Sequence, residues 1–231
     1  MSDVSFTPPY AGEPVLERRW DALGAQSDRA IVIAACALLA AVTIVRAVVA
    51  ARLPLTGDEA YYWEWSRRLA AGYADHPPAI ALAIAAFAWL GTSPFAVRLP
   101  MIVCGIGTAL AAAGAASTLA QNRRAGVLTL LAIALTPMAN VAFAEASPDG
   151  PFALCWALSL FFAAKVHRDK RASWFVLLGI ALGGALLSRL FGLALLAGVL
   201  ASDARNRRTW AACGIALLIW APFLFWNAAH H

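Results

Sequence analysis

The feature that most constrains this chain is a series of long apolar runs separated by short polar segments. The first run extends from Ala30 to about Arg52 and is interrupted by Arg46. A helix of about 20 apolar residues is long enough to cross the hydrocarbon core of a membrane. The chain is 61% hydrophobic and only 13% charged, whereas about 25% of the residues of a soluble domain are charged. These observations predict an all-α integral membrane protein.

Six further apolar runs are candidate spans, and the shorter ones have uncertain ends. They are Pro100–Ala120, Ala125–Ala144, Pro151–Ala164, Ser173–Leu187, Leu190–Ala201 and Thr209–Asn227. The run Ala79–Gly91 has only about 13 residues, which suits a re-entrant or interface helix better than a crossing. The sequence therefore predicts about seven membrane-spanning helices. Amphipathic and re-entrant helices are expected in residues 53–99, which form the first outer loop.

The distribution of charge orients the predicted spans. Basic residues gather at positions 18–29, 123–124, 165–171 and 205–208. Basic loops beside spans mark the cytoplasmic side of a membrane. Residues 1–29 are therefore expected to form a cytoplasmic N-terminal segment, and residues 30–231 a transmembrane module with its acidic loops outside. Because the basic groups follow membrane topology, the net charge of +5 does not indicate nucleic-acid binding.

Polar and aromatic residues are concentrated in the segment Leu55–Pro78. Thr56 followed three residues later by Glu59 is a capping box, which predicts a helix that begins at Gly57. An amphipathic helix on the outer membrane surface would account for Glu59 and for the tyrosines and tryptophans. It does not require Asp58, so a functional role for this carboxylate stands beside the purely structural interpretation.

Three other polar groups between apolar runs each have a structural and a functional interpretation. Asp75 and His76, in "GYADHPP", belong either to a rigid turn that the prolines impose or to the wall of a site. Ser147 and the following proline predict a helix start, so Asp149 either favours the helix dipole or is a second outer carboxylate. Arg189 lies between two short apolar runs, where it either extends to the interface or binds an anionic headgroup or phosphate.

Six motifs occur together in this chain: "GDEAYYWEWS", "GYADHPPAIA", "VRLP", "SPDGPF", "LLSRL" and "FLFWNAAHH". Their order resembles that of family 39-type glycosyltransferases of the GT-C fold, over about Leu53 to His231. That family includes protein O-mannosyltransferases, lipid A aminoarabinose transferases and Rgt-type galacturonosyl transferases. The pair "GDE" and "DHPP" at this spacing is the most specific part of the resemblance.

The resemblance implies an inverting enzyme that moves a sugar from a polyprenyl-phosphate donor to a hydroxyl of lipid A, a glycan or a protein. The reaction would occur at the outer face of the inner membrane, and the enzyme would be surrounded by membrane lipids. No cofactor is required, although a divalent metal between Asp58 and Asp149 is an option.

The family's essential first-loop acid matches Asp58, with Glu59 beside it, and its second-loop acid matches Asp149. The family often has lysine where this chain has Arg189, which suggests contact with the donor phosphate. The other residues expected to contact substrate are His76, Asp75, Arg98, Tyr61, Tyr62 and Tyr73.

Two other interpretations remain. A small transporter would be expected to place ionisable groups near the bilayer midplane, where this sequence has few. Family members commonly continue well beyond this length, so the resemblance also implies a C-terminally truncated form. Such a form could be a lipid-binding remnant without catalytic activity.

Overall fold

The computed structural model describes residues 14–230, and it describes the side chains of the first helix from Arg29 onward. This part of the chain consists of helices and loops without a strand, which confirms the predicted all-α class. The helices are α1 (Pro14–Arg52), α2 (Gly57–Arg67), α3 (Ala79–Ala86), the 3₁₀ helix η1 (Ala88–Leu90), α4 (Pro94–Ala120), α5 (Arg123–Leu135), α6 (Pro137–Ala142), α7 (Asp149–Asp169), α8 (Ala172–Ser188), α9 (Gly192–Ser202) and α10 (Arg207–His230). Most of the predicted N-terminal segment lies outside the residues whose side chains are described.

Four helical stretches of the described chain are long and apolar enough to cross a membrane: Arg29–Arg52, Pro94–Ala120, Asp149–Asp169 and Arg207–His230. The helices α8 and α9 are apolar but shorter. The predicted run Ala125–Ala144 is divided into α5 and α6 at Pro137. At 1.5 Å per residue α5 spans only about 20 Å, less than the hydrocarbon core of about 30 Å. The expected seven crossings are therefore not established.

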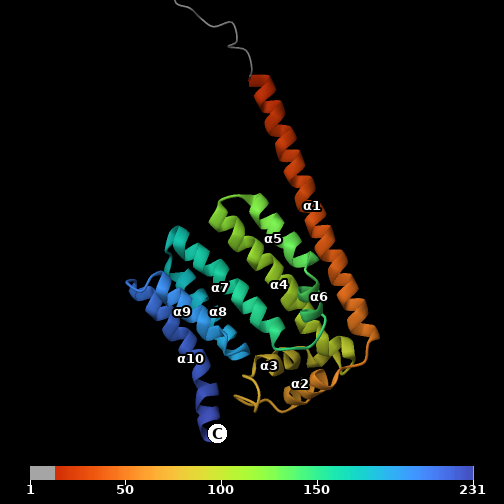
Figure 1. The fold of residues 1–231 in the computed structure, drawn as a ribbon, viewed down its shortest axis with the longest axis vertical. Helices are drawn as coiled ribbons and strands as arrows, with labels where there is room; N and C mark the ends of the chain where they lie inside the picture. The colour runs from red at the N-terminus through yellow and green to blue at the C-terminus, as the bar shows by residue number, and fades with distance from the viewer. Residues whose placement is uncertain (1–13, 231) are drawn as a thin grey trace, which may run out of the picture.

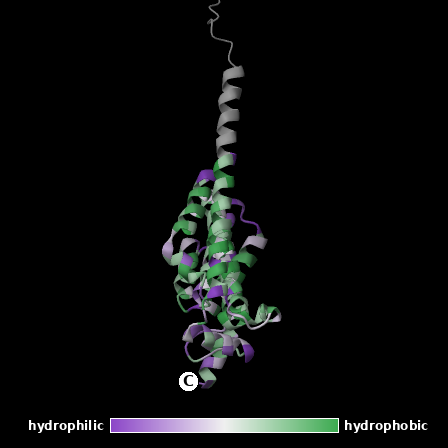
Figure 2. Ribbon diagram, turned by 90° about the vertical axis from the view of Figure 1, so that its right-hand side faces the viewer, coloured by the Kyte–Doolittle hydropathy of each residue, from purple (hydrophilic) through white to green (hydrophobic). Residues whose placement is uncertain are grey.

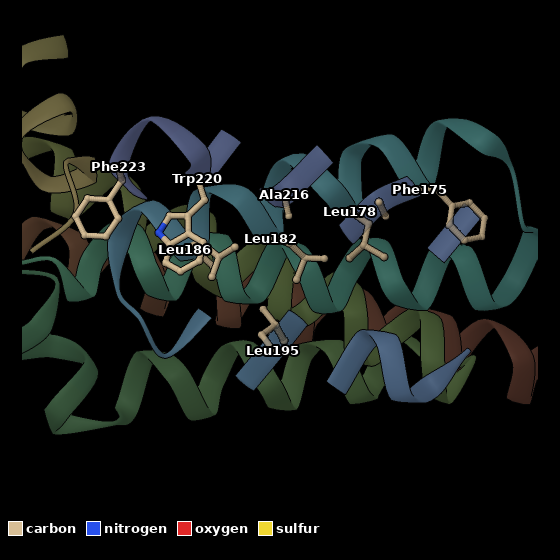
Figure 3. Close-up of a cluster of buried hydrophobic side chains, with 10 residues drawn as sticks. Phe175, Leu178, Leu182, Leu186, Leu195, Ala216, Trp220 and Phe223 are labelled. Atoms are coloured by element: carbon tan, nitrogen blue, oxygen red, sulfur yellow. The ribbon is translucent and has the colours of Figure 1, made fainter. Parts of the chain in front are cut away.

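The long helices form a bundle in which α4 packs between α1 and α7, and α8 packs between α7 and α10 (Figure 1). The helix α5 covers α1 and α4, and α9 lies against α8 and α10. The largest buried hydrophobic cluster joins α8, α9 and α10 (Figure 3) and includes Leu182, Leu186 and Trp220. A Cβ atom at Gly183 would lie only 2.8 Å from Ile219 Cβ, so a glycine permits the close approach of α8 to α10.

The segment between α1 and α4 folds back on one end of the bundle. Here α2 and α3 lie together below the ends of α1, α4 and α7 (Figure 1). The eight residues of α3 span about 12 Å, which is too short for a crossing. Hydrophilic residues are concentrated in this region, whereas the long helices are mainly hydrophobic (Figure 2).

The basic turns lie at the opposite end of the bundle. The Arg208 guanidinium donates to the Lys170 carbonyl over 2.9 Å and so joins two of the basic groups. The successive helices α1, α4, α5, α7, α8, α9 and α10 alternate in direction (Figure 1), which places the acidic loops at the other end. The separation of acidic and basic loops expected from the sequence is therefore present in the fold.

Candidate active site

The helix α2 begins with the predicted capping box. The Glu59 N–H donates to Thr56 Oγ1 at 3.3 Å, and the Thr56 N–H donates to Glu59 Oε2 at 2.8 Å. Because this box fixes the first turn of α2, it also fixes Asp58, which occupies that turn and is exposed. Within the described chain, no side chain forms an ion pair or a hydrogen bond with the Asp58 carboxylate. Asp58 is thus an oriented and accessible carboxylate at the end of the bundle.

A buried ion pair joins Glu59 of α2 to Arg98 of α4. Arg98 Nε donates to Glu59 Oε1 at 2.6 Å, and Arg98 Nη2 donates to Glu59 Oε2 at 2.5 Å. The two side chains are 0% and 5% exposed, Glu59 first. The other guanidinium protons of Arg98 reach the carbonyl oxygens of Ala50, Leu53 and Pro54. The pair therefore ties the end of α1 to α2 and α4.

The loop before α7 is attached to the same ion pair. The Ala146 N–H donates to Glu59 Oε1 at 2.9 Å, so both oxygens of Glu59 have two partners. Burial alone would raise the pKa of Glu59, but the bonds from Arg98, Ala146 and Thr56 outweigh burial and lower it. The structure thus pairs Glu59 with Arg98, and both side chains are almost completely buried.

Ring stacking and hydrogen bonds attach the turn "GYADHPP" to α2. The rings of Trp65 and Tyr73 stack with centroids 4.2 Å apart and an interplanar angle of 4°. The Tyr73 hydroxyl donates to the Trp65 carbonyl at 3.0 Å, and the Tyr61 hydroxyl donates to Asp75 Oδ2 at 3.0 Å. A Cβ atom at Gly72 would lie 2.5 Å from the Trp226 ring of α10. The turn is therefore wedged between α2 and α10.

A second ion pair, between Asp149 of α7 and Arg189, lies at the same end of the bundle. Arg189 Nε is 2.7 Å from Asp149 Oδ1, and Arg189 Nη2 donates to Oδ2 at 2.9 Å. The Arg189 side chain is 28% exposed and that of Asp149 is 49% exposed. The helix α7 begins at Asp149, and its cap residue is Pro148 without a side-chain bond. The expected capping by Ser147 was therefore wrong, because the chain turns at Pro148 and Asp149 occupies the first helical turn.

Arg189 also lines a cavity of about 560 Å³. Polar atoms come from Asp75, His76 and Asn227, and the apolar wall consists of Phe191, Leu193, Trp220, Phe223 and Leu224. Trp220 and Phe223 belong to the hydrophobic cluster of Figure 3, so a rigid core supports this wall. The cavity thus combines one guanidinium with a broad apolar surface.

Charged residues near this cavity shift the pKa values of Tyr62 and His76. Burial and the negative charge of Asp58 raise the pKa of Tyr62, which also senses Arg189, Asp75 and Asp149. Burial and the positive charge of Arg189 lower the pKa of His76, which favours the neutral imidazole. Tyr62 and His76 therefore both lie near Asp75, Asp149 and Arg189. Their ring centroids are 6.0 Å apart.

Sequence reasoning did not identify Asn140, which binds Arg46 of α1. Arg46 Nε and Nη2 donate to Asn140 Oδ1 at 3.1 and 2.8 Å, and the guanidinium lies 5.3 Å from the centroid of the Phe143 ring. Asn140 Nδ2 donates to the Ala134 and Thr136 carbonyls, where α5 ends. The available signal was an arginine inside an apolar run, since a charge at that depth needs a polar partner. Arg46 also lines a larger, mainly apolar cavity of about 640 Å³ beside α1.

The sequence left open a divalent metal between Asp58 and Asp149. Among residues 29–230, whose side chains the structure describes, no three side chains from histidine, cysteine, aspartate or glutamate come together as a metal site. A metal held by the two carboxylates Asp58 and Asp149 stays a prediction.

Comparison with known proteins gives one family match. The family model described as dolichyl-phosphate-mannose-protein mannosyltransferase matches residues 75–226. This range contains His76, Arg98, Asp149 and Arg189, whereas Asp58 and the rest of α2 precede it. No curated protein and no solved structure gave a significant match.

Proposed function

Since the chain belongs to the dolichyl-phosphate-mannose-protein mannosyltransferase family, we propose that it is an inverting membrane glycosyltransferase with a polyprenyl-phosphate sugar as donor. The acceptor is a hydroxyl of a lipid, a glycan or a protein. The active site faces the outside of the inner membrane, and the N-terminal segment lies in the cytoplasm, as the positive-inside rule favours. The observation that carries the proposal is the cavity in which Arg189 meets a broad apolar wall.

The donor has the two chemical parts that this cavity fits. Arg189 presents a planar guanidinium, which binds phosphate oxygens bidentately. Apolar side chains, among them Phe191 just before α9 and Leu224 of α10, accept the first isoprene units. The guanidinium pairs with Asp149, so a donor phosphate would compete with that carboxylate. The half-exposed Asp149 can turn toward water when the phosphate binds.

The transfer is a single displacement at the anomeric carbon. The acceptor oxygen bonds to that carbon while the bond from the carbon to the phosphate oxygen breaks. The acceptor proton passes to Asp58, and the departing electron pair stays on the polyprenyl phosphate, whose negative charge Arg189 stabilises. Asp58 suits the role of base because its carboxylate is exposed in a helical turn that the capping box holds rigid.

Glu59 and Arg98 act as positioning residues in this proposal. They hold α2 against α4 and the loop that leads to Asp149 through the Ala146 N–H. Their burial favours this positioning role. It speaks against the catalytic role expected for Glu59 and the substrate contact expected for Arg98. Tyr62, His76 and Asp75 remain candidates for contact with the sugar.

The proposal is tested with purified protein in vesicles that contain polyprenyl-phosphate mannose and membrane extract as the source of acceptor. We expect release of polyprenyl phosphate with wild type. Asp58→Asn should lower this rate by roughly 10²- to 10⁴-fold, because a positioned base contributes about that factor. Donor binding, measured by native mass spectrometry, should be retained in this variant.

Glu64→Gln provides the matched control, because Glu64 lies on the same helix and pairs with the exposed Arg67 and Arg68. This variant should transfer at the wild-type rate. Full activity of Asp58→Asn would contradict the assignment of the base. Binding of donor by wild type without any transfer would instead favour the lipid-binding remnant.

A further inference from the structure

A second amphipathic cavity lies at the basic end of the bundle, opposite the candidate active site. It has a volume of about 440 Å³ and lies between the start of the apolar part of α1 and the start of α5. Its lining consists of Arg29, Arg123 and Arg124 together with Ile31, Val32, Ile33 and Val127. Three guanidinium groups from two helices therefore meet at the mouth of an apolar groove.

The groove continues from this mouth along the bundle. A neighbouring cavity of about 420 Å³ shares Val32, Arg123 and Val127 with the first one. Its other lining residues are mainly small or apolar and come from α1, α4 and α5: Ala35, Cys36, Ala113, Gly114, Ser117, Gly126 and Leu130. The small side chains leave the space open. The combined groove thus has a cationic end and an apolar channel that runs toward the membrane interior.

Two of the cations at the mouth, Arg29 and Arg123, are available to a ligand. Arg29 and Arg123 are exposed, and no carboxylate among the described residues forms an ion pair with either of them. Some other exposed arginines do have such partners, as Arg171 pairs with Asp169 at 3.4 Å. Two neighbouring positive charges that pair with no carboxylate of the described residues create a local excess of charge that an anion would neutralise.

We infer that this groove binds an anionic diacyl phospholipid, with its phosphate on Arg29 and Arg123 and one acyl chain in the channel between α1 and α5. Basic pockets between membrane helices are suited to the headgroups of anionic lipids. A free phosphate would leave the apolar channel empty, and a neutral lipid would leave the arginines without a counter-charge. This site is separate from the one proposed for catalysis, because Asp58, Asp149 and Arg189 lie at the other end of the bundle.

Native mass spectrometry of the full chain in mild detergent tests the inference, with phosphatidylglycerol and phosphatidylcholine as probes. Wild type should retain phosphatidylglycerol in preference to phosphatidylcholine. The double variant Arg29→Gln/Arg123→Gln should weaken phosphatidylglycerol binding about thirtyfold, because each basic residue near the membrane surface contributes about fivefold. The matched control Arg205→Gln/Arg207→Gln removes the same charge at the same end and should bind as wild type does.

Two further measurements separate the headgroup from the chain. Cys36→Trp fills the channel without altering charge, since Cys36 is exposed and lines the second cavity, and it should also weaken phosphatidylglycerol binding. Millimolar inorganic phosphate should displace little of the lipid. Equal binding of the two lipids, an equal loss in the control, or full displacement by phosphate would overturn the inference.

Discussion

Two arginine–carboxylate pairs lie at the same end of this bundle, and their surroundings differ. Glu59 and Arg98 are buried, and both oxygens of Glu59 have two donors. Asp149 and Arg189 are half-exposed, and Arg189 borders a cavity. A pair of this second kind can exchange partners with a ligand, whereas the first cannot do so without leaving a buried charge. The same two functional groups therefore stabilise the fold in one place and are suited to bind a phosphate in the other.

Breaking the buried pair should give the largest effect on stability. We expect Glu59→Gln to lower the free energy of unfolding by about 3–5 kcal/mol, because it leaves the buried Arg98 charge uncompensated. Denaturation in mixed detergent micelles measures this loss. The double variant Glu59→Leu/Arg98→Met removes both charges and should recover part of the stability. A double variant less stable than Glu59→Gln would contradict the assignment of the loss to the unpaired charge.

Replacement of Arg189 should lower the rate of sugar transfer with little effect on the free energy of unfolding. Arg189→Leu should change the free energy of unfolding by less than about 1 kcal/mol, since a solvent-exposed ion pair contributes little. It should lower transfer by about 10²-fold, because the leaving phosphate loses its positive partner. Arg189→Lys retains the charge but cannot bind phosphate bidentately, so its transfer rate should lie between those of wild type and Arg189→Leu. A large loss of stability in Arg189→Leu would show that the Asp149–Arg189 pair stabilises the fold, as the Glu59–Arg98 pair does.

Asn140→Leu extends the comparison to Arg46, which is buried in the membrane-spanning part of α1. This variant removes the acceptor of two hydrogen bonds from the guanidinium. We expect a loss of about 1–3 kcal/mol in the free energy of unfolding, the cost of a buried donor without a partner. In Arg46→Leu/Asn140→Leu no such donor remains, so this variant should be more stable than Asn140→Leu. Equal stability of the two variants would mean that the hydrogen bonds do not stabilise the fold.

His76 should give the smallest effect, a dependence of stability on pH. Burial and Arg189 lower its pKa in the folded chain below the ordinary value of 6.5. The unfolded chain therefore binds a proton first as the pH falls below 6.5, so stability decreases there until the folded-state pKa is reached. His76→Gln should remove this slope, which thermal unfolding at a series of pH values measures. An unchanged slope in the variant would assign it to other groups.

Much of the fold could be predicted from local sequence patterns. The apolar run after Ala30 predicted the membrane-spanning part of α1, and the capping box at Thr56 predicted the first turn of α2. The prediction that Ala125–Ala144 forms one span was not confirmed, because Pro137 begins a separate short helix that Asn140 connects to Arg46. Hydropathy depends only on the composition of a segment, so it does not show where one helix ends and another begins within that segment.

The individual candidates of the site were also visible in the sequence, but their partners were not. Asp149 and Arg189 are 40 residues apart in the chain, and their ion pair exists only because α7 and α8 lie side by side. Glu59 and Asp58 are adjacent in sequence, yet one is buried against Arg98 and the other is exposed. Helical geometry turns neighbouring side chains about 100° apart, so the packing of α2 decides which carboxylate faces the solvent.

The sequence by itself determined that this protein is a helical membrane protein with its acidic and basic loops at opposite ends. These properties depend on the length of apolar runs, the caps of helices and the signs of nearby charges, which are local along the chain. Only the tertiary structure decided that Arg98 belongs to Glu59, that Arg189 belongs to Asp149, and that Arg29 and Arg123 meet at one groove. These pairings depend on which helices pack together, and packing depends on the shapes of whole helical faces.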